Sequence, residues 1–326
     1  MDYPMKSPHT YVRIEGSCNG LLMVVIYGGV GYPSEFPNFY IWNPCKKDDY
    51  ISLPQPSCLS PDRYHWITQE AAGFCYDSIL DDYKVIIIVS CMDISNYANV
   101  GIIYTTRTNT WRKLPPVPQD INICGSGYFT NGAVHWLARR KVDDGMRSRH
   151  VRGERDRILL TCFDIGSEEW REIPLGMDFE GDYEIAPQFS ITSRGKLYMS
   201  YTYYHYGDNP MVVDFHTKVH ELIDKDGQES CGACGTELWS LQSEDSFVRK
   251  VCFMVDNMVL VHADNYDDDY DVGEFTLHNF VEGKRLAKNA FVEVLTTQPF
   301  SNLNWLEAVR YCRSLVSPRQ LVKFAS

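Results

Sequence analysis

The chain has 326 residues, of which 44% are hydrophobic and 23% charged, an ordinary composition for a globular protein with a sizeable core. Its formal net charge is −12 at pH 7, and such an acidic surface repels nucleic-acid phosphates and anionic lipid headgroups. The longest apolar runs, Leu21–Tyr27 and Val85–Val89, are far too short to span a bilayer. We therefore expect partners that are neither nucleic acids nor membranes.

The N-terminus and the cysteines indicate a cellular compartment. Residues Met1–Lys6 contain no apolar signal region. The 11 cysteines are odd in number and follow no framework spacing, so reduced thiols are the simplest interpretation in a chain of this size. Together these features predict a cytoplasmic and/or nuclear protein.

Hairpin signals recur along the chain. Asn19-Gly20 and Asn131-Gly132 each stand between alternating apolar segments, and this pattern predicts a type I′ turn, which needs positive φ at both central residues. Arg194-Gly195 and, more loosely, Asp256-Asn257 occupy similar positions. A further hairpin with a longer acidic loop is expected between Gly73–Asp77 and Lys84–Val89.

Each hairpin is followed by a second pair of strands. These pairs are Phe39–Pro44 with Ile51–Pro54, Gly101–Thr105 with Trp111–Pro115, Leu159–Asp164 with Trp170–Pro174, and Met211–Phe215 with Val219–Ile223. Four strands repeated at intervals of roughly 50–60 residues are typical of propeller blades. The sequence therefore predicts an all-β, kelch-like β-propeller with about six four-stranded blades, or five as the alternative.

Two further features complete the predicted fold. Helical apolar spacing occurs over Asn304–Leu315, where we expect one short C-terminal helix. The tryptophans recur at fixed places in their repeats, so we expect them in the cores of the blades; they are Trp42, Trp111, Trp136 and Trp170.

Several of these segments also form an ordered set of motifs. The set comprises Gly16–Leu22, Ile41–Pro44, Gly73–Asp77 with Asp81–Val85, Asn131–Leu137, Phe163-Asp164 with Glu169–Leu175, and Tyr311–Ser317. In this order, across nearly the whole chain, the motifs resemble the F-box-associated domain of plant F-box and F-box/kelch proteins. The resemblance implies a propeller domain over 16–317, an N-terminal tail over 1–15 and a C-terminal tail over 318–326.

The resemblance also implies a function. Members of this family are substrate-receptor subunits of SCF-type E3 ubiquitin ligases, in which an F-box binds the Skp-family adaptor and the associated domain captures the target. Residues 1–15 carry no leucine-rich F-box pattern. A Skp-family adaptor and a cullin are therefore expected partners only if the full-length form has an F-box. The alternative is an F-box-less propeller that acts as an adaptor or decoy without coupling to a ligase.

Four motifs that could carry chemistry have plainer explanations. Cys231 and Cys234 have a metal-ligand spacing, but a structural zinc site needs four ligands and no second such pair is present. The acidic run Asp264–Asp271 lacks the glycine and glutamate of an EF-hand loop, and no helix pattern follows Gly28–Gly31 to hold a phosphate. The basic stretch Arg139–Arg157 is an insertion between strands, a nuclear-import signal or a patch for an acidic partner. We expect no metal and no cofactor.

The residue spacing gives no candidate Ser/His/Asp or Cys/His catalytic set. We therefore expect a protein-binding module, and an enzyme with a site in the propeller channel is the less favoured alternative. The partner is expected to be a protein substrate. Interface hot spots favour Tyr, Trp and Arg, which directs attention to aromatic clusters near predicted turns. The expected partner-binding residues are Tyr64, His65, Trp66, Tyr203, Tyr204, His205 and Tyr206.

Overall fold

A computed structural model of the chain describes residues 10–28, 36–46, 48–59, 66–92, 97–123, 125–140, 158–175, 185–191, 197–206, 213–222, 236–243, 246–255, 258–265, 274–279, 284–288 and 316–321. The chain divides into two compact units, and each is described by itself. Unit 1 comprises Met1–Tyr3 and Gly176–Arg310, and unit 2 comprises Pro4–Leu175 and Tyr311–Ser326.

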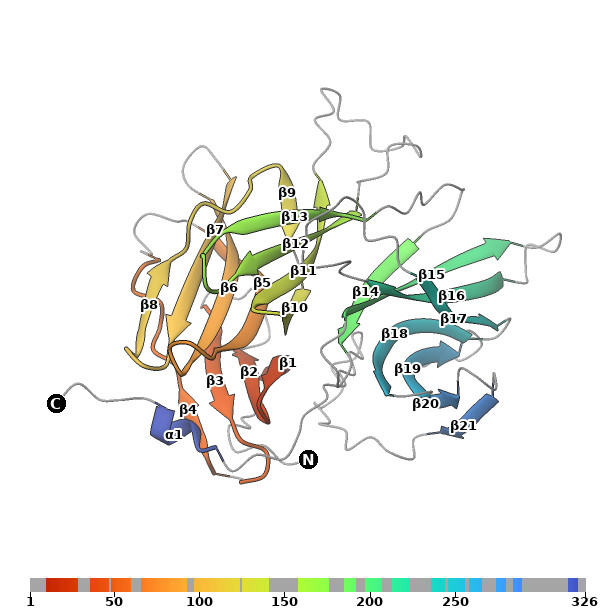
Figure 1. The fold of residues 1–326 in the computed structure, drawn as a ribbon, viewed down its shortest axis with the longest axis horizontal. Helices are drawn as coiled ribbons and strands as arrows, with labels where there is room; N and C mark the ends of the chain where they lie inside the picture. The colour runs from red at the N-terminus through yellow and green to blue at the C-terminus, as the bar shows by residue number, and fades with distance from the viewer. Residues whose placement is uncertain are drawn as a thin grey trace. The chain divides into compact units, whose positions relative to one another are not determined.

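Unit 2 begins with a four-stranded sheet in which the strands lie in sequence order (Figure 1). Its strands are β1 (Tyr11–Cys18), β2 (Leu21–Tyr27), β3 (Asn38–Trp42) and β4 (Tyr50–Ser52). Every pairing between them is antiparallel.

The second sheet of unit 2 combines two four-stranded antiparallel sets. The first set is β5 (Trp66–Asp77), β6 (Asp82–Met92), β7 (Tyr97–Thr105) and β8 (Thr110–Lys113). The second set is β10 (Gly125–Thr130), β11 (Ala133–Arg140), β12 (Ile158–Asp164) and β13 (Trp170–Pro174), and the short β9 (Ile121–Ile123) pairs with β11. A parallel pairing of Gly125–Gly127 with Ala71–Gly73 joins β10 to β5 and makes one nine-stranded sheet.

Unit 1 contains two more four-stranded antiparallel sheets, each in sequence order. They are β14 (Ile185–Ile191), β15 (Leu197–Tyr206), β16 (Val213–Leu222) and β17 (Thr236–Ser243), followed by β18 (Ser246–Val255), β19 (Met258–Asn265), β20 (Glu274–Asn279) and β21 (Lys284–Lys288). The prediction of two strands over Met211–Phe215 and Val219–Ile223 was wrong. Residues 213–222 form the single strand β16, which pairs along nearly its whole length with β15, and β17 is the fourth strand.

Five four-stranded sets are thus present in the part of the chain that the structure describes, which is the number of blades given by the alternative prediction. The predicted helix over Asn304–Leu315 lies outside the described residues. A single helical turn, α1 (Pro318–Leu321), forms in the segment expected to be a tail. The Ser317 hydroxyl donates to Asp49 Oδ1 at 2.7 Å and the Arg319 guanidinium to the Asp48 carbonyl at 2.6 Å, so these C-terminal residues are fastened to the turn before β4.

The unbroken apolar run in β6 is explained by burial on both faces. Val85, Ile87 and Val89 pack in one core with residues of β2 and β3, whereas Ile86 and Ile88 pack in a second core with residues of β11 and β12. Successive side chains of a strand point to opposite faces, so a strand between two neighbouring cores needs apolar residues at every position.

Glycines allow the first strands of the three sets in unit 2 to lie close together. β1, β5 and β10 contact one another. A methyl group added at Gly16 would lie 3.1 Å from Phe74 Cβ, and one added at Gly73 would lie 2.7 Å from Val134 Cγ1. At Gly127 it would meet the Trp136 indole. Gly16 and Gly73 therefore lie where a side chain of another set approaches the backbone, whereas Gly127 lies against Trp136 of its own set.

The sequence predicts the recurring tryptophans in the cores of the blades, and the indoles of Trp111, Trp136 and Trp170 also bond to a neighbouring set. Trp42 and Trp136 are fully buried and Trp111 is buried. The indole of Trp111 donates to the Pro54 carbonyl at 2.5 Å, and the indole of Trp170 donates to the Pro115 carbonyl at 3.2 Å. In both cases an outer strand binds the Leu-Pro segment that ends the preceding set, so the prolines of the repeat supply the acceptors.

The predicted turns are confirmed where the structure describes them. Asn19 and Gly20 have φ of 50° and 75°, and Asn131 and Gly132 have φ of 49° and 79°. Both pairs therefore have the positive φ at two central residues that a type I′ turn requires. Arg194-Gly195 and Asp256-Asn257 lie outside the described residues, although Val255 and Met258, on either side of the latter, pair in a hairpin.

Candidate protein-binding face

Alternate turns of the nine-stranded sheet in unit 2 lie at the same end of its strands for a topological reason. β5 and β10 run parallel, and every later strand of each set is antiparallel to its predecessor. The turns after the first and third strands of both sets therefore emerge at the same end. We call this end the turn face, made of residues 78–81, 106–109, 131–132 and 165–169.

The turn between β5 and β6 is fastened by the buried carboxylate of Asp77. Asp77 Oδ1 accepts hydrogen bonds from the backbone N–H groups of Ile79 at 2.9 Å and Leu80 at 3.1 Å. Its Oδ2 lies 2.6 Å from Lys84 Nζ, and both side chains of this ion pair are buried. Burial alone would raise the pKa of Asp77, but the bonds from Lys84 and from the turn backbone outweigh it, so the pKa is lowered.

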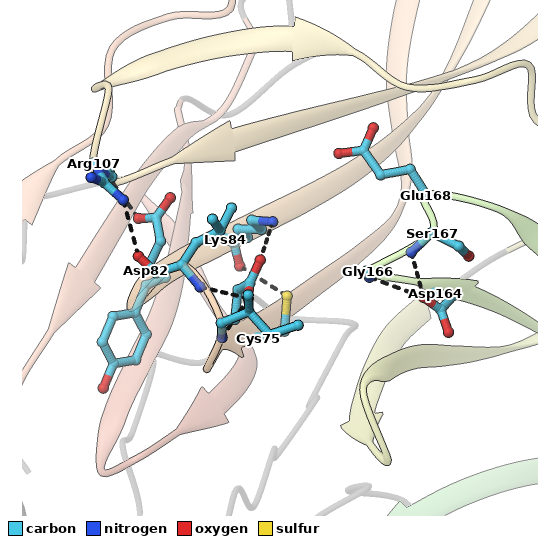
Figure 2. Close-up of polar contacts among 12 residues, drawn as sticks. Cys75, Asp82, Lys84, Arg107, Asp164, Gly166, Ser167 and Glu168 are labelled. Atoms are coloured by element: carbon cyan, nitrogen blue, oxygen red, sulfur yellow. Dashed lines mark hydrogen bonds and ion pairs between the residues drawn. The ribbon is translucent and has the colours of Figure 1, made fainter.

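A second buried carboxylate, Asp82, joins this turn to the next one. The Thr106 hydroxyl donates to Asp82 Oδ1 at 2.6 Å, and the backbone N–H of Arg107 donates to the same oxygen at 2.9 Å. The Arg107 guanidinium donates to the Leu80 carbonyl at 3.3 Å. Figure 2 shows Arg107 close to Asp82, with Lys84 and Cys75 beside them. Hydrogen bonds therefore hold the turns at 78–81 and 106–109 together.

The turn between β12 and β13 is built in the same way. Asp164 Oδ1 accepts hydrogen bonds from the backbone N–H groups of Gly166 at 2.9 Å and Ser167 at 2.8 Å (Figure 2). The bond from Ser167 is the largest of the effects that lower the pKa of Asp164. An ion pair between Glu168 and Arg112 of β8 links this turn to the neighbouring set. The turn face is therefore a series of short turns, several of which are fixed by carboxylates and bonded to one another.

The aromatic residues predicted to bind a partner are placed differently from the expectation. Tyr64 and His65 lie outside the described residues. Trp66 is the first residue of β5, where it pairs with Met92, so it stands at the opposite end of that strand from the turn face. The four residues Tyr203–Tyr206 do not form a turn but end the strand β15, paired with β16. They belong to unit 1, whereas Trp66 belongs to unit 2.

The other sequence motifs fall mostly outside the described residues. This holds for Cys231, Cys234, residues 29–31, 141–157 and 266–271. Asp264 and Asn265 end strand β19, and Arg139 and Arg140 end strand β11. Within the described ranges, no three or more His, Cys, Asp or Glu side chains are grouped in a way that could hold a metal ion. Nor is any helix there long and apolar enough to cross a membrane.

Three buried or half-buried thiols in unit 2 are poor nucleophiles. Burial raises the pKa of Cys18 to about 12 and that of Cys91 to about 11. The thiolate is the reactive form, so both groups are protonated and unreactive at neutral pH. The buried Cys75, whose thiol donates to the Lys84 carbonyl at 3.6 Å, also has a raised pKa because of burial.

Comparisons with known proteins agree with this architecture. Residues 5–213 match the model of the F-box associated beta propeller domain family. The chain is 26% identical over 143 residues to a putative F-box protein and 26% identical over 171 residues to an F-box/kelch-repeat protein, both from Arabidopsis thaliana. These matches cover 43% and 50% of this chain, and 33% and 39% of the relatives. The chain thus spans well under half the length of the curated relatives it matches.

The fold and the family model together define a β-propeller of the kind found in protein-interaction modules of F-box proteins. The chain belongs to the F-box associated β-propeller domain family, because the family model covers more than half of it. Solved structures with a similar fold include a prolyl endopeptidase (TM-score 0.44, 10% identity, 86% of this chain and 42% of that chain). Another is a GH32 β-fructofuranosidase from Bombyx mori (TM-score 0.41, 10% identity, 81% and 59%). These two similarities are too low to bear on function.

Proposed function

We propose that this chain is the substrate-recognition part of an SCF-type E3 ubiquitin ligase receptor, and that it acts by binding a protein client and not by catalysis. Membership of the F-box associated domain family carries this proposal. The turn face supports it, because short turns fixed by buried or hydrogen-bonded side chains are suited to presenting a preformed surface.

The mechanism is proximity. In receptors of this kind an F-box binds the Skp-family adaptor and, through it, the cullin, while the associated domain holds the client. Ubiquitin transfer is then performed by other subunits, so the propeller contributes affinity and orientation and no reacting group. We place this activity in the cytoplasm and/or nucleus.

Two surfaces are candidates for the client. The first is the turn face of unit 2. The second comprises the aromatic residues singled out from the sequence, of which Tyr204 and Tyr206 offer the sharpest test because four aromatic or imidazole residues adjoin there. Replacing both tyrosines with alanine is expected to weaken client capture without lowering the thermal midpoint of unfolding. Unchanged capture would remove this surface from the proposal.

The experiment that tests the proposed function is affinity capture from plant-cell extract followed by quantitative mass spectrometry. The expected result is co-recovery of a client with the Skp-family adaptor and a cullin. A client recovered without the adaptor or cullin would contradict coupling to the ligase and favour an adaptor or decoy. Recovery of no specific client would contradict the interaction module itself.

A further inference from the structure

The tip of the turn between β5 and β6 exposes two large aliphatic side chains. Ile79 is 85% exposed and Leu80 is 48% exposed, and they are the large hydrophobic side chains that stand out as exposed among those that the structure describes. Turn tips usually carry Gly, Asn, Asp or Ser, because these residues satisfy turn geometry without exposing apolar area. Two aliphatic residues at such a position are not explained by the needs of the turn.

The tip is held in place by side chains on both sides. Asp77 binds the backbone N–H groups of Ile79 and Leu80, while the Arg107 guanidinium binds the Leu80 carbonyl. The Tyr76 hydroxyl donates to Asp81 Oδ1 at 2.5 Å. These bonds fix the backbone that carries the aliphatic side chains, so little conformational entropy is left to lose on binding.

A positive charge lies beside the aliphatic pair. Arg107 is exposed, and none of the described carboxylates forms an ion pair with its guanidinium, whose hydrogen bond goes to the Leu80 carbonyl. The exposed arginine of the neighbouring strand, Arg112, is instead paired with Glu168. Arginine next to apolar groups is typical of the residues that dominate binding energy at protein interfaces.

We propose that Ile79, Leu80 and Arg107 form a preorganised knob that inserts into an apolar pocket of a client protein, with a carboxylate at the rim of that pocket pairing with Arg107. The convex, aliphatic tip requires a concave apolar partner surface, and the charge of Arg107 selects the acidic rim. The inference rests on the proposed function, since it names the chemistry by which the turn face would recognise its client.

The test compares wild type with the double variant Ile79→Ser/Leu80→Ser and with Arg107→Glu. Because Ile79 and Leu80 project from the surface, the double variant is expected to keep the thermal midpoint and far-UV circular dichroism of the wild type. Arg107→Glu also loses the bond to the Leu80 carbonyl, so it is judged by charge reversal on the client. Arg139→Ala is the matched control, as it removes an exposed arginine at the end of β11 opposite the turn face. A client captured by the wild type is purified and titrated against all four proteins.

We expect the double variant to bind this client at least about 10-fold more weakly, as when aliphatic side chains are lost from an apolar pocket, whereas Arg139→Ala binds as the wild type does. Replacing the carboxylate residue at the rim of the client's pocket by lysine should restore the affinity of the client for the Arg107→Glu variant. Equal affinity of wild type and double variant would overturn the knob while leaving the proposed function standing. Sedimentation could instead show that the wild type is a dimer and the double variant a monomer. That result would also overturn the knob, because the tip would then bind a second copy of this chain. The absence of any saturable client would overturn both proposals.

Discussion

Gly127→Ala tests whether the space that Gly127 leaves for Trp136, whose indole bonds to the neighbouring strand set, stabilises unit 2. The added methyl group would lie 2.8 Å from Val134 Cγ1 and closer still to the Trp136 indole nitrogen. Trp136 is fully buried and its indole N–H donates to the Ala72 carbonyl at 2.9 Å. The substitution therefore forces the indole to move and breaks this bond.

The expected loss has two parts. Overpacking of a core costs about 1–3 kcal/mol, and leaving a buried hydrogen-bonding group unpaired costs about 1–3 kcal/mol more. We therefore expect Gly127→Ala to lower the free energy of unfolding by roughly 2–6 kcal/mol in urea titrations followed by near-UV circular dichroism. Gly28→Ala is the matched control, since a methyl group there meets no atom within 4 Å, and it should stay within about 1 kcal/mol of the wild type.

A double-mutant cycle identifies the cause. Trp136→Phe removes the indole nitrogen that the new methyl group would strike, so Gly127→Ala should cost less in the Trp136→Phe background, with a coupling of about 0.5–3 kcal/mol. If Gly127→Ala is as stable as Gly28→Ala, or if the cycle shows no coupling, the role of Gly127 in making room for the Trp136 bond between the strand sets is refuted.

Three further outcomes are expected. Asp77→Asn leaves the buried Lys84 ammonium without its anion and should lower the free energy of unfolding by about 3 kcal/mol at pH 7. Folding lowers the pKa of Asp77, so its stabilising contribution is present above the unfolded-state pKa of about 3.9 and is lost as the pH falls through the folded-state pKa. The difference in stability between variant and wild type should therefore narrow in acid, and a constant difference would contradict the role of the ion pair. Trp111→Phe should lower the free energy of unfolding by about 1–3 kcal/mol, measured in urea, since the Pro54 carbonyl loses its donor; an unchanged midpoint would argue against the bridge. In alkylation at neutral pH, read by mass spectrometry, exposed Cys45 should be modified in the native protein and Cys91 only after denaturation, and early labelling of Cys91 would contradict its burial.

Local signals in the sequence predicted much of the fold. The Asn19-Gly20 and Asn131-Gly132 turns were predictable because positive φ at two successive residues has a narrow sequence signature. The apolar run at Val85–Val89 signalled a buried strand. Residues 213–222 were misassigned, because alternation does not tell one long strand from two short ones when the turn residues between them are uninformative.

The candidate site was harder to predict, since its features depend on contacts between distant segments. The Trp111 indole reaches a carbonyl 57 positions away, and Asp82 binds groups 24 and 25 positions away. Neither partner is encoded by spacing. The exposure of Ile79 and Leu80 was equally hidden although their acidic loop was predicted, because a predicted loop does not show which of its side chains face solvent. The acidic residues around the pair were the available signal that the segment is a turn.

The central claim, that the chain recognises a protein client for ubiquitination, is tested most directly by the half-life of that client. The measurement is a translation-inhibitor chase in plant cells with and without the protein, in the presence and absence of a proteasome inhibitor. The account predicts that the captured client is degraded more slowly when the protein is missing, and that proteasome inhibition abolishes the difference. An equal half-life of the client in cells with and without the protein would contradict the central claim.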